Sequence, residues 1–126
     1  MAGGRGRYPF ISVVTIGELR KGFTILPESK RRAFLEYWLQ SELLPWFEER
    51  ILPITQAIAD RRGILDGHSQ LRGAPLNTAY GMIAATAIEH NLTVVTRNVK
   101  DFKGLGVTIF NPWEPGNDFP KLTHVR

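Results

Sequence analysis

The alternation of apolar and polar positions predicts an α/β chain. The run Phe10–Thr15 is rich in β-branched residues and almost wholly apolar, which is typical of a strand buried on both faces of a parallel sheet. Two further runs of this kind are Leu92–Thr96 and Val107–Phe110. Because these runs alternate with segments of helical character, we expect an α/β domain with a largely parallel sheet.

The segment from Asn77 to Asn91 has the strongest helical pattern. It is apolar almost all round, as expected of a helix that packs on a sheet. Asn77 or Thr78 can cap its first turn, and Asn91 can adopt the left-handed conformation at its end. The sequence therefore predicts a buried helix between these residues.

Three other helices are expected earlier in the chain. Helical character begins directly after the first strand, at Thr15, and ends near Gly22. A second amphipathic segment follows Pro27, and Pro45 should close it because proline lacks a backbone N–H. Thr55 is well placed to cap the third helix.

Length and composition fit one globular domain. The chain has 126 residues, of which 43% are hydrophobic and 22% are charged. No apolar stretch approaches the length of a membrane span, and no apolar region follows the basic N-terminus as it would in a secretory signal. The absence of cysteine excludes disulfides and thiolate metal sites, and it fits a reducing cytoplasm.

The charge balance is basic. Sixteen Lys and Arg against twelve Asp and Glu give a net charge of +4. This balance would favour a polyanionic partner, but charge alone favours the more ordinary interpretation, a mildly basic surface without any partner. The basic residues form clusters: Arg5 with Arg7, Lys30 to Arg32, Arg61 with Arg62, and Arg97 with Lys100 and Lys103.

Two acidic residues follow the ends of predicted strands. Glu18 lies three residues after Thr15, and Asp101 lies five residues after Thr96. Ligands of open α/β sheets bind beyond the carboxyl ends of the strands, so both acids should approach the same edge. Carboxylates at this edge could hold Mg²⁺ or Mn²⁺, which would activate water for phosphoryl chemistry.

Each acid also has a purely structural interpretation. Thr15 and Glu18 have the spacing of a capping box, in which the carboxylate only satisfies a helix N-terminus. Asp101 can be an ordinary turn residue or the cap of a short helical turn. A zinc site is not expected, because the histidines lack ligand spacing; they are His68, His90 and His124.

Five blocks of sequence, in order, resemble the PIN-domain toxins of the VapC and FitB-like type. The blocks are Phe10–Gly22, the pair Gly73–Leu76 and Ile83–Ala87, then Leu92–Asn98, Asp101–Phe102 and Asn111–Glu114. The resemblance implies a PIN-type three-layer α/β/α sandwich over residues 10–115. It also implies a Mg²⁺- or Mn²⁺-dependent endoribonuclease that acts on RNA, pairs with an antitoxin and forms a homodimer. Residues 1–9 would then be a disordered basic arm, and residues 116–126 a C-terminal tail.

The resemblance assigns site roles residue by residue. Of the family's four acidic positions, Glu18 matches the second and Asp101 the fourth, so these two would be the catalytic and metal-binding residues. Three polar residues would line the site: Thr15, Thr96 and Asn98. Two basic residues, Arg97 and Lys100, would contact phosphate.

Two of the four acids have no counterpart. Tyr80 stands at the third acidic position, and a phenol is neutral at pH 7 and a poor ligand for a hard cation. The first acid and the central strand that carries it are unmatched, since the resemblance begins at the family's second strand. Arg62 also stands where relatives often carry Trp.

These departures predict an inactive or severely impaired ribonuclease. Two carboxylates bind a metal ion more weakly than four, and a catalytic unit loses most of its rate when one member is lost. The alternative is a degenerate PIN domain that acts only as an interaction module, binding an antitoxin or a second copy of itself. A third interpretation is a truncated product with no selected function. A missing central strand would expose sheet edges. We therefore expect either a rearranged strand order or a partner chain over the gap, most simply in a homodimer.

Overall fold

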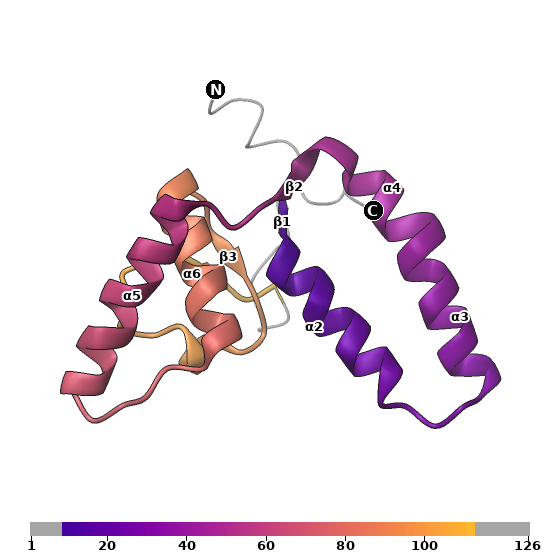
Figure 1. Ribbon diagram of the computed structural model, residues 1–126, viewed down its shortest axis with the longest axis horizontal. Helices are drawn as coiled ribbons and strands as arrows, with labels where there is room; N and C mark the ends of the chain where they lie inside the picture. The colour runs from indigo at the N-terminus through magenta and orange to yellow at the C-terminus, as the bar shows by residue number, and fades with distance from the viewer. Residues whose placement is uncertain (1–8, 113–126) are drawn as a thin grey trace.

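The computed structural model describes residues 9–112 as helices joined to short parallel strands (Figure 1). In chain order the elements are β1 (Ile11–Ser12), α2 (Val13–Thr24), α3 (Lys30–Trp38), η1 (Leu39–Leu43), α4 (Leu44–Phe47), η2 (Glu48–Arg50), β2 (Ile51–Leu52), α5 (Gln56–Leu71), α6 (Thr78–His90), β3 (Val94–Val95), η3 (Val99–Asp101) and β4 (Ile109–Phe110). The predicted α/β class with parallel strands is confirmed. The expected arm and tail and the end of the fifth block lie outside the described residues.

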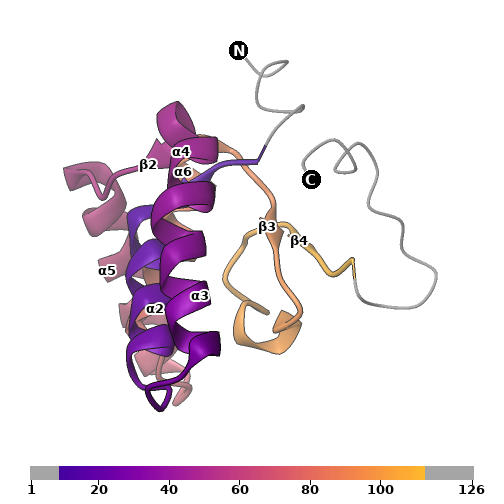
Figure 2. The same ribbon diagram turned by 90° about the vertical axis from the view of Figure 1, so that its right-hand side faces the viewer.

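The strands form two separate parallel pairs. β1 pairs with β2, with Ile11 opposite Ile51, and β3 pairs with β4, with Val94 opposite Ile109. Within the described part of the chain, no strand joins the two pairs into one sheet. Figure 2 shows β3, β4 and their loops on one side of the helices.

The first strand is much shorter than the prediction of Phe10–Thr15, which was wrong in its extent. Helix α2 begins at Val13 because Ser12 caps it: the backbone N–H of Val14 donates to Ser12 Oγ at 3.0 Å. Thr15 therefore lies inside the first turn of the helix. The capping-box interpretation of Thr15 and Glu18 is wrong for the same reason, and the helix runs on past Gly22 to Thr24.

Pro45 does not close the second helix, contrary to the prediction. The chain continues from α3 through a π-helical turn, η1, into α4, and Pro45 occupies the first turn of α4. The backbone N–H of Leu44 bonds to the carbonyl of Leu39, five residues earlier. This wider turn restarts the helix, so that proline sits where its missing N–H is tolerated.

The predicted caps of the last two long helices are confirmed. Thr55 Oγ1 accepts from the N–H of Ile58 at the start of α5, and Asn77 Oδ1 accepts from the N–H of Tyr80 at the start of α6. Asn91 ends α6 in the left-handed conformation, with φ 57°. Helix α5 packs along α6, and Arg61 Nε bonds Glu89 Oε2 across them at 2.8 Å.

A small core lies between α6 and the β3–β4 pair. Its buried members are Ala84, Ala87, Val94, Phe102 and Leu105, and Tyr80 packs against them from the first turn of α6. The small alanines let the strands and the following loop approach the helix closely. This core therefore fixes the loop after β3 against the start of α6. Among the described residues, no helix is both long and apolar enough to span a membrane.

Candidate functional site

The loop after β3 is held by its own polar groups. The N–H of Asn98 donates to Thr96 Oγ1 at 3.0 Å, and the N–H of Asp101 donates to the carbonyl of Asn98 at 3.1 Å. The second bond closes the 3-10 turn η3, which carries Lys100 and Asp101. The chain thus leaves the carboxyl end of β3 in a tight turn, with its polar and charged side chains gathered there.

Tyr80 faces this loop from α6. Its ring lies against Phe102, with ring centroids 5.2 Å apart, and Asn98 Nδ2 donates to its hydroxyl at 3.4 Å. Tyr80 is half-buried, while Asn98 and Asp101 are exposed. The structure therefore brings together four of the residues predicted for the site: Tyr80, Thr96, Asn98 and Asp101.

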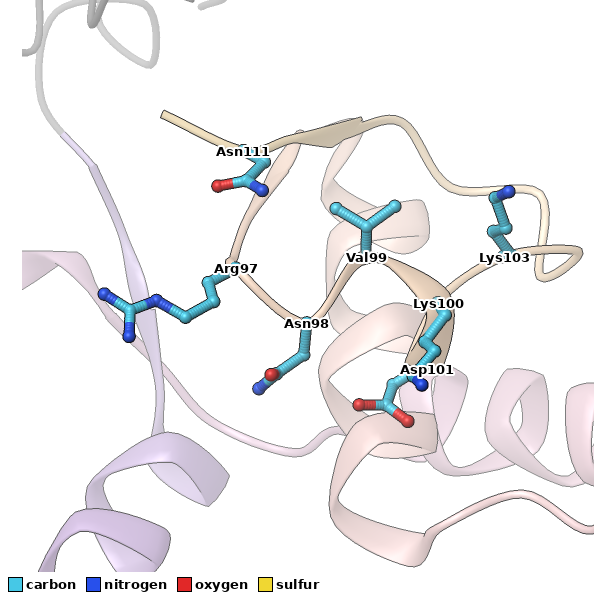
Figure 3. Close-up of a pocket in the computed structure, with 7 residues that line it drawn as sticks. All are labelled: Arg97, Asn98, Val99, Lys100, Asp101, Lys103 and Asn111. Carbon is cyan, nitrogen blue, oxygen red and sulfur yellow. The ribbon is translucent and has the colours of Figure 1, made fainter. Parts of the chain in front are cut away.

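A pocket of about 410 Å³ opens over the same loop (Figure 3). Its lining residues are Arg97, Asn98, Val99, Lys100, Asp101, Lys103 and Asn111. In Figure 3 Arg97 and Lys103 lie at opposite ends of the group, and Lys100 lies beside Asp101. The lining thus carries three cationic side chains and a single carboxylate.

The other predicted residues lie on α2. Glu18 is exposed and Thr15 is half-buried, and neither lines the pocket. Helix α2 packs against α6, the helix that carries Tyr80, so these residues belong to a neighbouring element. The expectation that Glu18 and Asp101 act as one site therefore stays a prediction, with Asp101 alone of the two in the pocket lining.

The residues present do not fit a divalent metal ion. Between residues 9 and 112, no group of three or more His, Cys, Asp or Glu side chains could hold a metal. Asp101 is the only carboxylate in the pocket lining, which also contains three cationic side chains. Mg²⁺ and Mn²⁺ prefer several oxygen ligands with negative charge, and this lining supplies one carboxylate.

Three lining residues were not assigned to the site from the sequence: Val99, which is apolar, and the polar residues Lys103 and Asn111. Lys103 belongs to the basic cluster with Arg97 and Lys100, so the charge pattern was a usable signal for it. Asn111 follows β4, and the rule that sites lie beyond the carboxyl ends of parallel strands could have found it.

Arg62, which departs from the family pattern, is built into the helix interface. Its Nη2 lies 3.3 Å from Thr78 Oγ1 and 3.6 Å from Asp66 Oδ2, and its aliphatic stem lies beside Gly81. The arginine stem thus packs between α5 and α6, while its charged end reaches the start of α6.

Comparison with known proteins identifies the family. The PIN domain family matches residues 5–106. The chain is 36% identical to the VapC ribonuclease Y4jK of Sinorhizobium fredii, over 84% of this chain and 76% of the relative. It is also 36% identical to toxin FitB of Neisseria gonorrhoeae, over 82% and 75%. A plasmid stability protein, StbB of Pseudomonas syringae pv. tomato, is 34% identical over 83% and 76%.

Solved structures agree with the sequence match. FitAB bound to an IR36 DNA fragment superposes with a TM-score of 0.75 at 33% identity, covering 83% of this chain and 73% of that chain. VapBC2 of Rickettsia felis, bound to a DNA fragment from its promoter, has a TM-score of 0.66 at 25% identity, covering 83% and 74%. The predicted PIN-like α/β fold is therefore confirmed, and the chain belongs to the PIN domain family, among relatives of the VapC and FitB toxin type.

Proposed function

We propose that this chain is a toxin-type PIN-domain protein whose metal-dependent ribonuclease activity is absent or severely impaired. The observation that carries the proposal is the position of Tyr80. Its neutral side chain stands at the start of α6 beside Asn98, where the family resemblance implies a carboxylate. A phenol donates no negative charge to a metal ion, and its ring is already packed against Phe102.

The remaining acids support the same proposal. Asp101 lies in the pocket lining among cations, and Glu18 lies outside that lining on α2. One carboxylate in a cationic pocket should bind Mg²⁺ or Mn²⁺ weakly, because ligand charge largely sets the affinity for hard cations. Without a bound metal, neither the attacking water nor the developing phosphoryl charge is stabilised, so hydrolysis of RNA should be slow.

An RNA cleavage assay tests this proposal. The full chain is incubated with single-stranded RNA in Mg²⁺ or Mn²⁺, in parallel with Glu18→Ala and Asp101→Ala. We expect no metal-dependent cleavage above the level of either variant. Metal-dependent cleavage that both substitutions abolish would overturn the proposal, since it would require both acids to act at one functional metal site.

An interaction role for the chain is supported by the α2–α3 hairpin (Figure 1). Its most exposed large apolar side chains are Ile25, Phe34 and Tyr37, with 75%, 61% and 62% of their surface accessible. Phe34 and Tyr37 lie one helical turn apart on α3, so they form one apolar stripe. Exposed apolar side chains grouped in this way favour a protein partner.

We propose that this stripe binds an antitoxin, because the chain is related to toxin FitB and the similar solved structures are FitAB and VapBC complexes. Self-association is the other outcome. Light scattering of the full chain, compared with Phe34→Ser/Tyr37→Ser, separates the two. A concentration-dependent dimer that the double substitution dissociates would assign the stripe to self-association; a monomer that binds a coexpressed antitoxin, and loses it on substitution, would support the proposal.

A further inference from the structure

We infer that the outer face of α5 binds α5 of a second copy of this chain, in an antiparallel pair about a two-fold axis at the level of Ile64. Figure 1 shows α5 at an outer edge of the ribbon, with α6 along its inner side. The inference goes beyond the proposed function, since it uses neither the metal site nor the apolar stripe on α3. It names the face and the register of a self-association.

The outer face of α5 carries an apolar spine that is open to solvent. Leu71 is 87% exposed, Ile64 is 47% exposed, and Ala57 is exposed as well. These three residues recur at intervals of seven, or about two helical turns, so they lie above one another over about 21 Å. The buried residues of α5, Ile58 and Ser69, lie on a different side of the helix. The spine is therefore not part of the core.

Asp60 and His68 flank this spine on its two sides. Each is four residues from Ile64, so they fall about 40° to either side of it on the helix. Both are exposed, and neither side chain forms a hydrogen bond or ion pair with any residue from 9 to 112. They are about 12 Å apart along the axis, which is too far for contact within one chain. Both polar groups are therefore available to a partner.

This face is complementary to itself. About a two-fold axis at the level of Ile64, residues equally spaced before and after that position face each other across the pair. Asp60 of one copy then lies opposite His68 of the other, where the carboxylate can accept a hydrogen bond from the imidazole N–H. Leu71 lies opposite Ala57, a large side chain against a small one. A parallel pair would set Asp60 against Asp60, so charge favours the antiparallel arrangement.

Burial of the spine would drive the association, because removal of exposed apolar surface from water is favourable. Gly67 lies on the same face, and no atom lies within 4 Å of the position that a Cβ would take there. A second helix can therefore approach closely beside it. A single pair of helices is a small interface, so we expect a dimer that dissociates on dilution.

The first experiment tests the register by disulfide cross-linking of the full chain. The chain has no cysteine, so a single introduced cysteine reports on one position. Ile64→Cys places two thiols beside the two-fold axis, and mild oxidation should join them. Leu71→Cys is the matched control, because the two copies of residue 71 would lie about 21 Å apart. We expect Ile64→Cys to cross-link at least about tenfold faster. Equal rates would overturn the inference, since random collision would explain both.

The second experiment exchanges the charges and measures the dimer by analytical ultracentrifugation. Asp60→Lys and His68→Glu should each weaken it at least about tenfold, because the first sets an ammonium against His68 and the second sets a carboxylate against Asp60. The double variant Asp60→Lys/His68→Glu should restore the affinity to within about threefold, since an ammonium then faces a carboxylate. Because the two positions do not touch within one chain, this rescue reports on contacts between copies.

A monomer at every concentration would overturn the inference, and so would a dimer that the charge exchange fails to restore in variants folded by circular dichroism. Phe34→Ser/Tyr37→Ser should leave the α5 dimer intact. A dimer that this substitution dissociates, and that Asp60→Lys does not weaken, would assign self-association to the α3 stripe and overturn the inference. Antitoxin binding to the stripe is measured separately on the dimer, so the two proposals can fail independently.

Discussion

The side-chain amide of Asn98 donates a hydrogen bond to the hydroxyl of Tyr80 at 3.4 Å. This contact joins the loop after β3 to the first turn of α6, the two segments that meet at the candidate site. It is long for a hydrogen bond, so its energetic contribution should be small. Its interest is chemical: the neighbour of Asn98 on α6 is a phenol, at the position where the family resemblance implies a carboxylate.

Tyr80→Asp should partly restore metal binding. The shorter side chain places a carboxylate at the start of α6, on the side that faces Asn98 in the loop that also carries Asp101. We expect the affinity for Mn²⁺ to rise at least about tenfold, equivalent to about 1.4 kcal/mol. Titration calorimetry with Mn²⁺ measures it, and Tyr80→Asn is the matched control, since it has the same size without the charge.

Both substitutions also remove the ring that packs against Phe102, and the loss should cost on the order of 2 kcal/mol of folding free energy. Tyr80→Phe keeps the ring and should change the stability by less than about 1 kcal/mol. Equal Mn²⁺ affinity for the Asp and Asn variants, both folded by circular dichroism, would contradict the prediction.

The start of α2 gives a second prediction, about stability. Ser12→Ala removes the oxygen that accepts from the N–H of Val14, and it should lower the free energy of unfolding by about 1 kcal/mol. Thr15→Ala should cost less than about 0.5 kcal/mol, because Thr15 lies inside the helix and caps nothing. Denaturant unfolding of both variants checks this; a larger loss for Thr15→Ala would indicate that the helix begins at Thr15 after all.

Arg50 joins the beginning of β1 to the end of α4, and Arg50→Lys should break that link. Its guanidinium donates to the carbonyls of Pro9 and Trp46, at 2.8 and 2.6 Å, and lies 4.3 Å from the Trp46 ring centroid. Lysine cannot form this fork or stack in the same way. We expect a loss of about 1–3 kcal/mol in the free energy of unfolding.

Thermal and denaturant unfolding measure the effect of Arg50→Lys. The control is Arg31→Lys, an exposed position on α3 where the same exchange should be close to neutral. If Arg50→Lys and Arg31→Lys changed the free energy of unfolding equally, the contacts of the Arg50 guanidinium would add nothing to stability beyond its charge.

Helix caps could be predicted from the sequence, because a single residue decides each of them. Thr55 and Asn77 cap helices because their side chains can reach a backbone N–H within the first turn, whatever lies around them. The end of the helix that follows Pro27 was harder to predict. Pro45 stops a regular α-helix, but a π turn around Leu39 accommodates it, and that turn depends on how the surrounding helices pack.

The candidate site was predictable only in part. The rule that sites lie beyond the carboxyl ends of strands predicted Asp101 at such an edge, and Asp101 lines a pocket after β3 together with Asn98, which the family resemblance had assigned. Glu18 depends on where α2 begins. With Ser12 as the cap, the helix starts before Thr15, so the position of Glu18 on the helix differs from the one expected. An apolar β-branched run is compatible with a strand or a buried helix, and periodicity alone cannot decide between them.

The end of α6 offers a last test, in which backbone conformation is separated from side-chain chemistry. Asn91 has φ 57° and ψ 50°, and the turn it forms lets the N–H of Leu92 bond the carbonyl of Ala87 at 2.8 Å. In this region an L-residue with a Cβ is strained, and Asn tolerates it better than Ala. Asn91→Ala should therefore cost about 1 kcal/mol in the free energy of unfolding.

Asn91→Gly, by contrast, should stay within about 0.5 kcal/mol of the parent chain, because glycine adopts positive φ without strain. Asn91 is exposed, so neither substitution leaves a cavity. Denaturant unfolding of the two variants decides the matter. If Gly destabilised the chain as much as Ala does, the contribution of Asn91 would come from hydrogen bonds of its side chain, and the left-handed turn would not explain the choice of asparagine there.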